Sequence, residues 1–227
     1  SDLEQNYYKD IVEVIPKSTS LLAGSFYKKN NNIFNSIINI SDKSDNVYSK
    51  SHLVPFGEFL PFRNILSNAY KSLGLTTYDI TPGDFNNLLS IDRFIAKPLI
   101  CYESIFSAES LVLEENVDFI LNVSNDGWFG ETLAPYQHLD ALVMRSLENQ
   151  RYSVRSTNTG ISAIISPEGV IEDYVQFNNT GIINRTIVSR NGNTPLSKYG
   201  YEILYFLFFI VFLYSAIYFN IKLFRRL

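Results

Sequence analysis

The chain has 227 residues, of which 46% are hydrophobic and 19% are charged, and its formal net charge is −4 at pH 7. This composition supplies enough apolar material for one sizeable core. A negative net charge without a long basic stretch argues against nucleic acid as the main partner. Cys101 is the only cysteine, so the chain contains no internal disulfide.

The first 40 residues predict a helix and then a β-hairpin. The predicted helix ends at Pro16, and one face of it is formed by Tyr8, Ile11, Val12 and Ile15. Residues 21–27 and 33–40 are rich in apolar and β-branched side chains, and they flank a turn at 28–32.

The second half of the chain alternates predicted strands and helices. Strands are expected at 98–101 and 118–123, with a helix between them from about residue 107 to 115. Pro135 can open a further helix, whose apolar stripe consists of Leu139, Leu142, Val143 and Leu147. Three more strands are expected at 153–157, 161–166 and 170–177, the last two joined by a turn at 167–169. This alternation predicts a layered α/β domain.

The C-terminal segment is apolar from residue 203 to 219 apart from tyrosines and Ser215. It is close to the roughly 20 residues that span a bilayer as a helix, and we expect one transmembrane helix. A short basic end follows, formed by Lys222, Arg225 and Arg226. The positive-inside rule places this end in the cytoplasm and the preceding domain outside. The alternative is a buried core helix. We therefore divide the chain into a domain at 1–198 and a membrane segment at 199–227.

Cys101 ends an apolar run at the point where a buried strand is expected to give way to a helix. The unpaired backbone N–H groups at a helix start stabilise negative charge and favour the thiolate, which is the reactive form of cysteine. This position suits a nucleophile. The alternative is an inert cysteine in the core.

Two other residues fit chemistry at this thiol. Lys50 and Glu58 precede Cys101 in the chain, and each lies near turn-forming glycine or proline. In a thiol acyl-transfer site, a lysine stabilises the developing oxyanion, a carboxylate handles protons and the sulfur carries the acyl group.

At these residues the sequence resembles the carbon–nitrogen hydrolase (nitrilase) superfamily and, more narrowly, its membrane-bound branch, the apolipoprotein N-acyltransferases. The resemblance rests on K-S-H-L-V-P-F-G-E-F-L-P at 50–61, I-C-Y-E at 100–103, N-V-S-N-D-G-W-F-G at 122–130, and the runs at 144–148 and 155–160. It extends over nearly the whole chain. It implies a four-layer α-β-β-α sandwich followed by one C-terminal transmembrane helix, in a monomer of the bacterial inner membrane whose catalytic domain faces the periplasm.

The resemblance also implies an activity. Cys101 would take a fatty acyl group from a membrane phospholipid as a thioester, and the N-terminal amino group of diacylglyceryl-cysteine in an apolipoprotein would then accept it. Lys50 and the backbone N–H of Tyr102 would stabilise the oxyanion. No cofactor is implied, and the two distant histidines without a second cysteine form no zinc-site pattern.

Other matched positions have supporting roles in this interpretation. Glu58 would orient Lys50 or assist proton movement, and Glu103 would support the elbow at Cys101 rather than act as base. Trp128 would form a wall of the acyl pocket, which Phe56 and Phe59 would also line. His138 and His52 are expected to make structural hydrogen bonds.

Residues 56–75 carry more apolar side chains than an ordinary loop: Phe56, Phe59, Leu60, Phe62, Ile65, Leu66, Leu73 and Leu75. They form either a mobile arm over the active site that contacts lipid and admits acyl chains, or part of the core.

One departure from the family pattern concerns the general base. In nitrilase-type sites it is a glutamate in a Pro-Glu motif before the first helix, and no Pro-Glu precedes Lys50 here. We therefore expect a C-terminal fragment with the base upstream of Ser1, and little activity from this chain alone. Two alternatives remain open, which are a membrane-tethered amidase acting on a small amide and a degenerate, membrane-anchored binding module.

Overall fold

The computed structural model describes residues 13–16, 18–41, 46–74, 79–84 and 87–224. The predicted N-terminal helix falls almost entirely outside these residues, because only its last positions belong to them.

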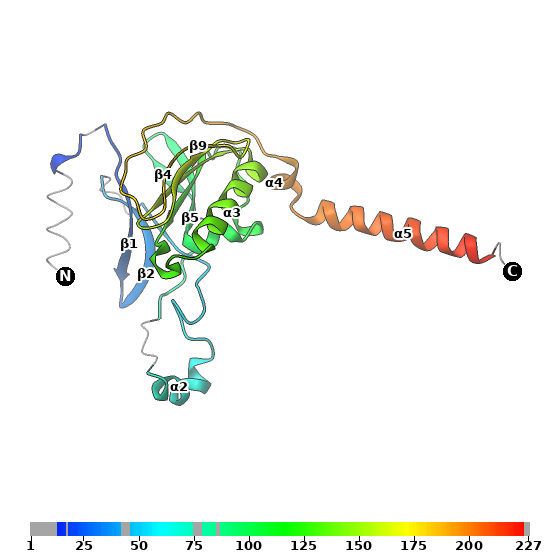
Figure 1. Ribbon diagram of the computed structural model, residues 1–227, viewed down its shortest axis with the longest axis horizontal. Coiled ribbons are helices and arrows are strands. Elements are labelled where there is room, and N and C mark those ends of the chain that lie inside the picture. The colour runs from blue at the N-terminus through cyan, green and yellow to red at the C-terminus, as the bar shows by residue number, and fades with distance from the viewer. Residues whose placement is uncertain (1–12, 17, 42–45, 75–78, 85–86, 225–227) are drawn as a thin grey trace.

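The predicted hairpin is confirmed and belongs to a three-stranded antiparallel sheet (Figure 1). This sheet has the order β1 (Leu22–Lys29), β2 (Asn32–Asn39) and β3 (Val47–Ser49). The turn is shorter than expected, since Asn30 and Asn31 have φ angles of 48° and 67° and close a two-residue loop. Asparagine tolerates this left-handed conformation, which matches the twist of the two strands.

A six-stranded mixed sheet forms the second layer. Its strands follow the sequence order: β4 (Leu89–Ile91), β5 (Phe94–Ile100), β6 (Phe119–Ser124), β7 (Tyr152–Thr157), β8 (Ser162–Ile165) and β9 (Ile171–Val175). The three central strands, β5 to β7, are parallel, and the outer pairs are antiparallel. The apolar runs of β5 and β6 suit strands that are covered on both faces. The strands predicted in this half are confirmed, with bounds that differ by a few residues.

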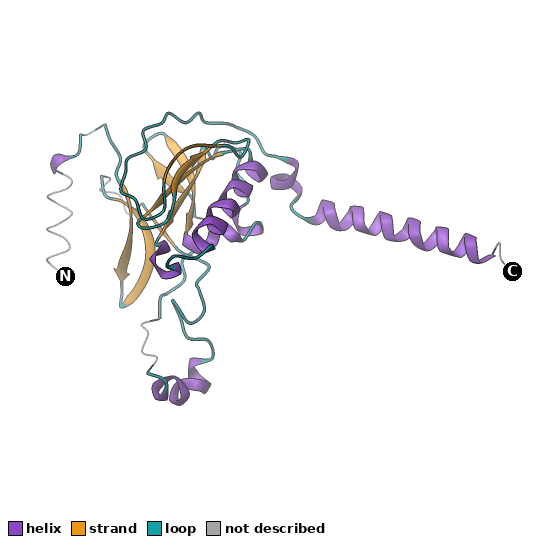
Figure 2. Cartoon of the chain, in the orientation of Figure 1, coloured by secondary structure: helices purple, strands orange, loops and turns teal. Residues whose placement is uncertain are grey.

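Two hydrophobic clusters hold the layers together. One lies between the two sheets and includes Ile37, Tyr48, Ile100 and Leu121. The other lies under α3 (Ala134–Asn149), whose predicted apolar stripe packs Leu139 and Leu142 on the second sheet. Leu147 does not join this core and is 38% exposed. Figure 2 shows the resulting order of three described layers, sheet, sheet and helix.

The helix predicted at residues 107–115 is wrong. Only a short 3₁₀ helix, η2 (Ala108–Ser110), forms, and the backbone is extended at Leu111. The backbone N–H of Val112 donates to Asn149 Oδ1 at 2.7 Å, so it is not available for a helical hydrogen bond. The buried Leu111 and Val112 therefore pack as an extended segment beside α3.

The apolar stretch at 56–75 contains α2 (Arg63–Ser72) and projects away from the two sheets (Figure 1). Phe62, Ile65 and Leu73 are 73%, 80% and 72% exposed, which excludes the core interpretation for them. Leu60 and Tyr70 are buried. Leu75 lies outside the described residues.

The C-terminal end of the chain contains α4 (Pro195–Tyr199) and then α5 (Glu202–Phe224), which extends away from the body (Figure 1). Its segment Glu202–Phe219 has a mean hydropathy of 2.0 and none of it is buried. The predicted apolar helix is therefore confirmed by length and composition, and the buried-core alternative is wrong.

Candidate active site

Cys101 is the first residue of the short 3₁₀ helix η1 (Cys101–Ile105), directly after β5. Its φ angle of 52° places a non-glycine residue in the left-handed region, which costs roughly 1–2 kcal/mol. The elbow lies at the carboxyl edge of the parallel strands, where ligands bind in open α/β sheets. The helix predicted to begin here is thus only a short 3₁₀ helix, and its dipole stabilises a thiolate less than the dipole of a full α-helix would.

Glu103 joins this elbow to the segment that follows β3. The carboxylate is 1% exposed and accepts five hydrogen bonds. Its donors are Tyr48 Oη at 3.0 Å, Ser51 N at 2.8 Å, Ser51 Oγ at 3.0 Å, His52 N at 3.1 Å and Ile100 N at 2.7 Å. Both oxygens are occupied, so this geometry supports the predicted elbow role and leaves no lone pair directed at Cys101 chemistry.

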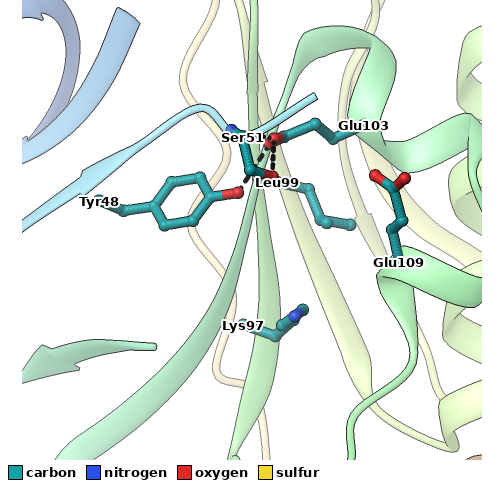
Figure 3. A pocket seen from close by; sticks show the side chains of 6 residues that line it. All are labelled: Tyr48, Ser51, Lys97, Leu99, Glu103 and Glu109. Atoms are coloured by element: carbon teal, nitrogen blue, oxygen red, sulfur yellow. Dashed lines mark hydrogen bonds between the residues drawn. The ribbon is translucent and has the colours of Figure 1, made fainter. Parts of the chain in front are cut away.

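Burial and the neighbouring Glu103 charge raise the pKa of Tyr48, which keeps its hydroxyl protonated as a donor. Figure 3 shows Tyr48 and Ser51 facing Glu103, with Lys97, Leu99 and Glu109 beside them. The space that these six side chains line has no room for a water molecule. We call the hydrogen bonds of Glu103 with Tyr48, Ser51, His52 and Ile100 the Glu103 clamp. The space is a packing feature of this clamp and not a substrate pocket.

Lys50 lies one residue before Ser51, so the Glu103 clamp also fixes the lysine backbone beside the elbow. The Lys50 side chain is 1% exposed, and its Nζ lies 2.7 Å from Glu58 Oε2. Glu58 also accepts from Asn35 Nδ2 at 2.9 Å and from Val54 N at 2.8 Å. These contacts support the predicted role of Glu58 in orienting Lys50. The buried charge of the lysine is paired, as its burial requires.

A buried polar cluster lies behind Cys101 on the β6, β7 and α3 side. His138 Nε2 lies 2.7 Å from the carbonyl oxygen of Cys101, and its Nδ1 lies 3.2 Å from Asp126 Oδ1. Arg155 Nη2 donates to Asp126 Oδ2 at 2.7 Å. Desolvation alone would raise the pKa of Asp126, but the His138 hydrogen bond and the Arg155 charge outweigh it and lower the pKa. Burial lowers the pKa of Arg155, although the negative charges of Asp126 and Cys101 act to raise it.

The remaining predicted residues are exposed or partly buried, and no contact joins Trp128, Phe56 or Phe59 to Cys101 among the contacts of the described residues. Trp128 is 84% exposed on η3 (Asp126–Phe129), Phe56 is 59% exposed and Phe59 is partly buried. Tyr102 is 36% exposed. His52 pairs with Glu109 at 2.8 Å and stacks on Phe106. Among the described residues no group of three His, Cys, Asp or Glu side chains could hold a metal ion.

Sequence analysis assigned no role to Asn35, Asp126 or Arg155. Asn35 contacts the predicted residue Glu58, and Asp126 and Arg155 contact the predicted residue His138. The strand pattern does indicate Arg155, because Arg155 and Ser153 lie on the same face of β7 and this face is buried. A charged residue at an inward strand position implies a buried partner. Asn35 carries no such signal within its polar neighbourhood.

Glu103→Gln tests the clamp. The neutral amide keeps one acceptor oxygen and turns an NH2 group toward donors such as Ile100 N, so we expect a loss of about 3 kcal/mol in unfolding free energy. Glu109→Gln, in the same cluster, is the matched control. Its pair with His52 is partly exposed and is worth under about 1 kcal/mol. Equal losses for the two variants in denaturant unfolding would contradict the clamp.

Comparison with known proteins gives a matching family profile and several relatives of similar sequence. The carbon–nitrogen hydrolase family profile matches residues 17–193. The apolipoprotein N-acyltransferase of Wigglesworthia glossinidia brevipalpis is 39% identical over 208 residues, which cover 88% of this chain and 42% of that protein. The apolipoprotein N-acyltransferase of Coxiella burnetii is 37% identical over 187 residues, covering 81% and 38%. The chain spans about two fifths of the length of these curated relatives.

Solved structures agree on the fold. A carbon–nitrogen hydrolase from Helicobacter pylori G27 superposes with a TM-score of 0.56 at 11% identity, over 77% of this chain and 64% of that one. Saccharomyces cerevisiae Nit3, a member of branch 10 of the nitrilase superfamily, gives a TM-score of 0.55 at 14% identity, over 77% and 62%. At such identities the likeness shows the fold alone. The family profile, which covers residues 17–193, establishes that this chain belongs to the carbon–nitrogen hydrolase family.

Proposed function

We propose that the protein transfers a fatty acyl group from a membrane phospholipid to the N-terminal amino group of diacylglyceryl-cysteine in an apolipoprotein. The relatives named apolipoprotein N-acyltransferase support this activity. The observation that carries the choice of transfer over hydrolysis is α5, whose exposed apolar segment suits a bilayer. An amidase that acts on a small soluble amide requires no such anchor.

In the first half-reaction, the Cys101 thiolate attacks the carbonyl carbon of the phospholipid ester. A C–S bond forms and the ester C–O bond breaks. The leaving lysophospholipid oxygen takes up the proton that the thiol gave to the base. Lys50 and the Tyr102 N–H stabilise the tetrahedral oxyanion, and Glu58 holds Lys50 in place.

In the second half-reaction, the α-amino group of the lipid-modified cysteine attacks the thioester carbonyl. A C–N bond forms, the C–S bond breaks, and the proton that the amine loses returns to the sulfur through the base. Two steps over a covalent intermediate replace one difficult transfer.

The general base is a carboxylate outside the described residues in this proposal. Glu103 has both oxygens occupied by five donors, and Glu58 is paired with Lys50. Neither carboxylate is available to take the proton of the Cys101 thiol.

The same proposal sets the location of the protein. We place α5 across the bacterial inner membrane, with the basic residues after it in the cytoplasm and the catalytic domain in the periplasm. The exposed apolar residues around α2 then contact lipid beside the site, and Trp128, Phe56 and Phe59 line the path of the acyl chain. The protein acts as a monomer.

The arm is tested by Phe62→Asp. Phe62 is 73% exposed, so the charge costs little folding stability, but it opposes contact with lipid. We expect about a tenfold loss in phospholipid turnover without a change in melting temperature. Ile182→Asp, at a position on the body that is 95% exposed, is the control and should change neither quantity. Unchanged turnover in Phe62→Asp would remove the arm from the proposal.

The function itself is tested with membranes that contain the protein expressed from its complete gene. They are incubated with labelled phosphatidylethanolamine and a diacylated lipopeptide. Triacylated lipopeptide is the expected product. Free fatty acid without lipopeptide product, or ammonia released from small amides, would instead identify a hydrolase. Lipid binding with neither product would identify a binding module.

A further inference from the structure

The carbonyl group of Cys101 is held by two side chains, His138 and Ser104. His138 Nε2 lies 2.7 Å from this oxygen. A carbonyl oxygen can only accept, so the ring nitrogen is the donor. Ser104 Oγ donates to the same oxygen at the longer distance of 3.2 Å. His138 is 1% exposed, so its ring is shielded from bulk solvent.

The other edge of the imidazole is fixed by an ion pair. His138 Nδ1 lies 3.2 Å from Asp126 Oδ1 and 3.3 Å from Arg155 Nη2, and the Asp126 carboxylate accepts from Arg155 Nη2 at 2.7 Å and from Ser124 Oγ at 2.5 Å. Asp126 is completely buried, as is nearly all of Arg155. The ring therefore has one orientation available to it.

Gly160 shows how closely this cluster is packed. A Cβ atom at residue 160 would lie 2.1 Å from Asp126 Oδ2, so only glycine leaves room for the carboxylate. The loop after β7 is thus shaped around Asp126, independently of the hydrogen bonds to His138.

The consequence for the site follows from the geometry of one peptide unit. The C=O of Cys101 and the N–H of Tyr102 belong to the same planar group and, in a trans peptide, point in opposite directions. A donor that fixes the carbonyl oxygen therefore also fixes the direction of the N–H.

We propose that His138 is a positioning residue, which donates to the Cys101 carbonyl and thereby aims the Tyr102 N–H at the oxyanion, with the Asp126–Arg155 pair holding its ring. This inference rests on the proposed role of Cys101 as nucleophile. His138 touches no substrate and acts through the peptide plane alone.

Two substitutions separate this role from simple packing. His138→Gln places an amide N–H near the position of Nε2 and can still donate to the Cys101 carbonyl. His138→Asn places its amide near the position of Nδ1, toward Asp126, and cannot reach that carbonyl. Both variants remove the imidazole from the same buried site, so we expect similar losses in melting temperature.

The measurement is single-turnover acylation of Cys101 by phosphatidylethanolamine in the full-length protein, with hydrogen–deuterium exchange of the peptide that contains residues 100–106. We expect His138→Asn to lower the acylation rate constant about 10²-fold, the usual effect of losing one oxyanion donor, with KM unchanged. His138→Gln should stay within about tenfold of the wild type. Exchange at 100–106 should accelerate in His138→Asn alone.

Equal rate losses and equal exchange in the two variants would overturn the positioning role. Wild-type protein that forms no thioester, but shows faster exchange in His138→Asn alone, would overturn the proposed function and leave the elbow contact established. The two failures are therefore distinguishable.

Discussion

Cys101→Ala is expected to abolish acyl transfer, with a loss of about 10⁴-fold or more in the rate of lipopeptide acylation. Cys101 is the only cysteine in these 227 residues, so within them no second thiol can carry the acyl group. Glu103 and His138 hold the elbow through its backbone, and these hydrogen bonds do not involve the sulfur. The variant should therefore fold, with an unchanged melting temperature.

Cys101→Ser is the matched variant, because it keeps the size and polarity of the side chain. A hydroxyl is a much weaker nucleophile than a thiol at neutral pH, since almost none of it ionises. We expect turnover to fall nearly as far as in the alanine variant. Appreciable formation of triacylated lipopeptide by either variant would show that another group receives the acyl chain.

Lys50→Met should cause the second largest loss, about 10²–10³-fold in kcat, because it removes the positive charge proposed to face the oxyanion. It should also destabilise the fold by about 3 kcal/mol, since Glu58 loses a partner 2.7 Å away in a mostly buried pair. Reduced activity alone would therefore not separate chemistry from folding.

The double variant Lys50→Met with Glu58→Gln separates the two effects. Removing both charges should restore most of the lost stability, because no unpaired charge remains. Activity should stay as low as in Lys50→Met. Recovery of activity together with stability would mean that the lysine only supports the fold.

Much of the architecture could be predicted from local patterns. The hairpin, the buried parallel strands and α3 follow from periodicity and turn residues, which act over a few positions. The predicted helix at 107–115 failed because a distant side chain decided the outcome. The Asn149 side chain accepts a hydrogen bond from the backbone N–H of Val112. The two residues are 37 positions apart, so periodicity cannot reveal this contact.

The candidate site also contains residues that local motifs predict and residues whose roles depend on distant contacts. Lys50, Glu58, Cys101 and Glu103 could be selected from their motifs, and the structure adds how they are held. Asn35 could not, because its role depends on a contact with a residue 23 positions away in the chain. The inward position of Arg155 on β7 indicates a buried partner, but it does not identify Asp126, which lies 29 positions away. The register of the sheets creates these contacts, and no short motif encodes it.

The central claim is that the sulfur of Cys101 carries an acyl group, and intact-mass spectrometry tests it most directly. The protein, purified from membranes after expression from its complete gene, is incubated with phosphatidylethanolamine without an acceptor. We expect a mass increase of one acyl chain, located on Cys101 by fragmentation and removed by neutral hydroxylamine, as a thioester would be. An unmodified Cys101 after lipid turnover, or an equal adduct in Cys101→Ala, would contradict the account.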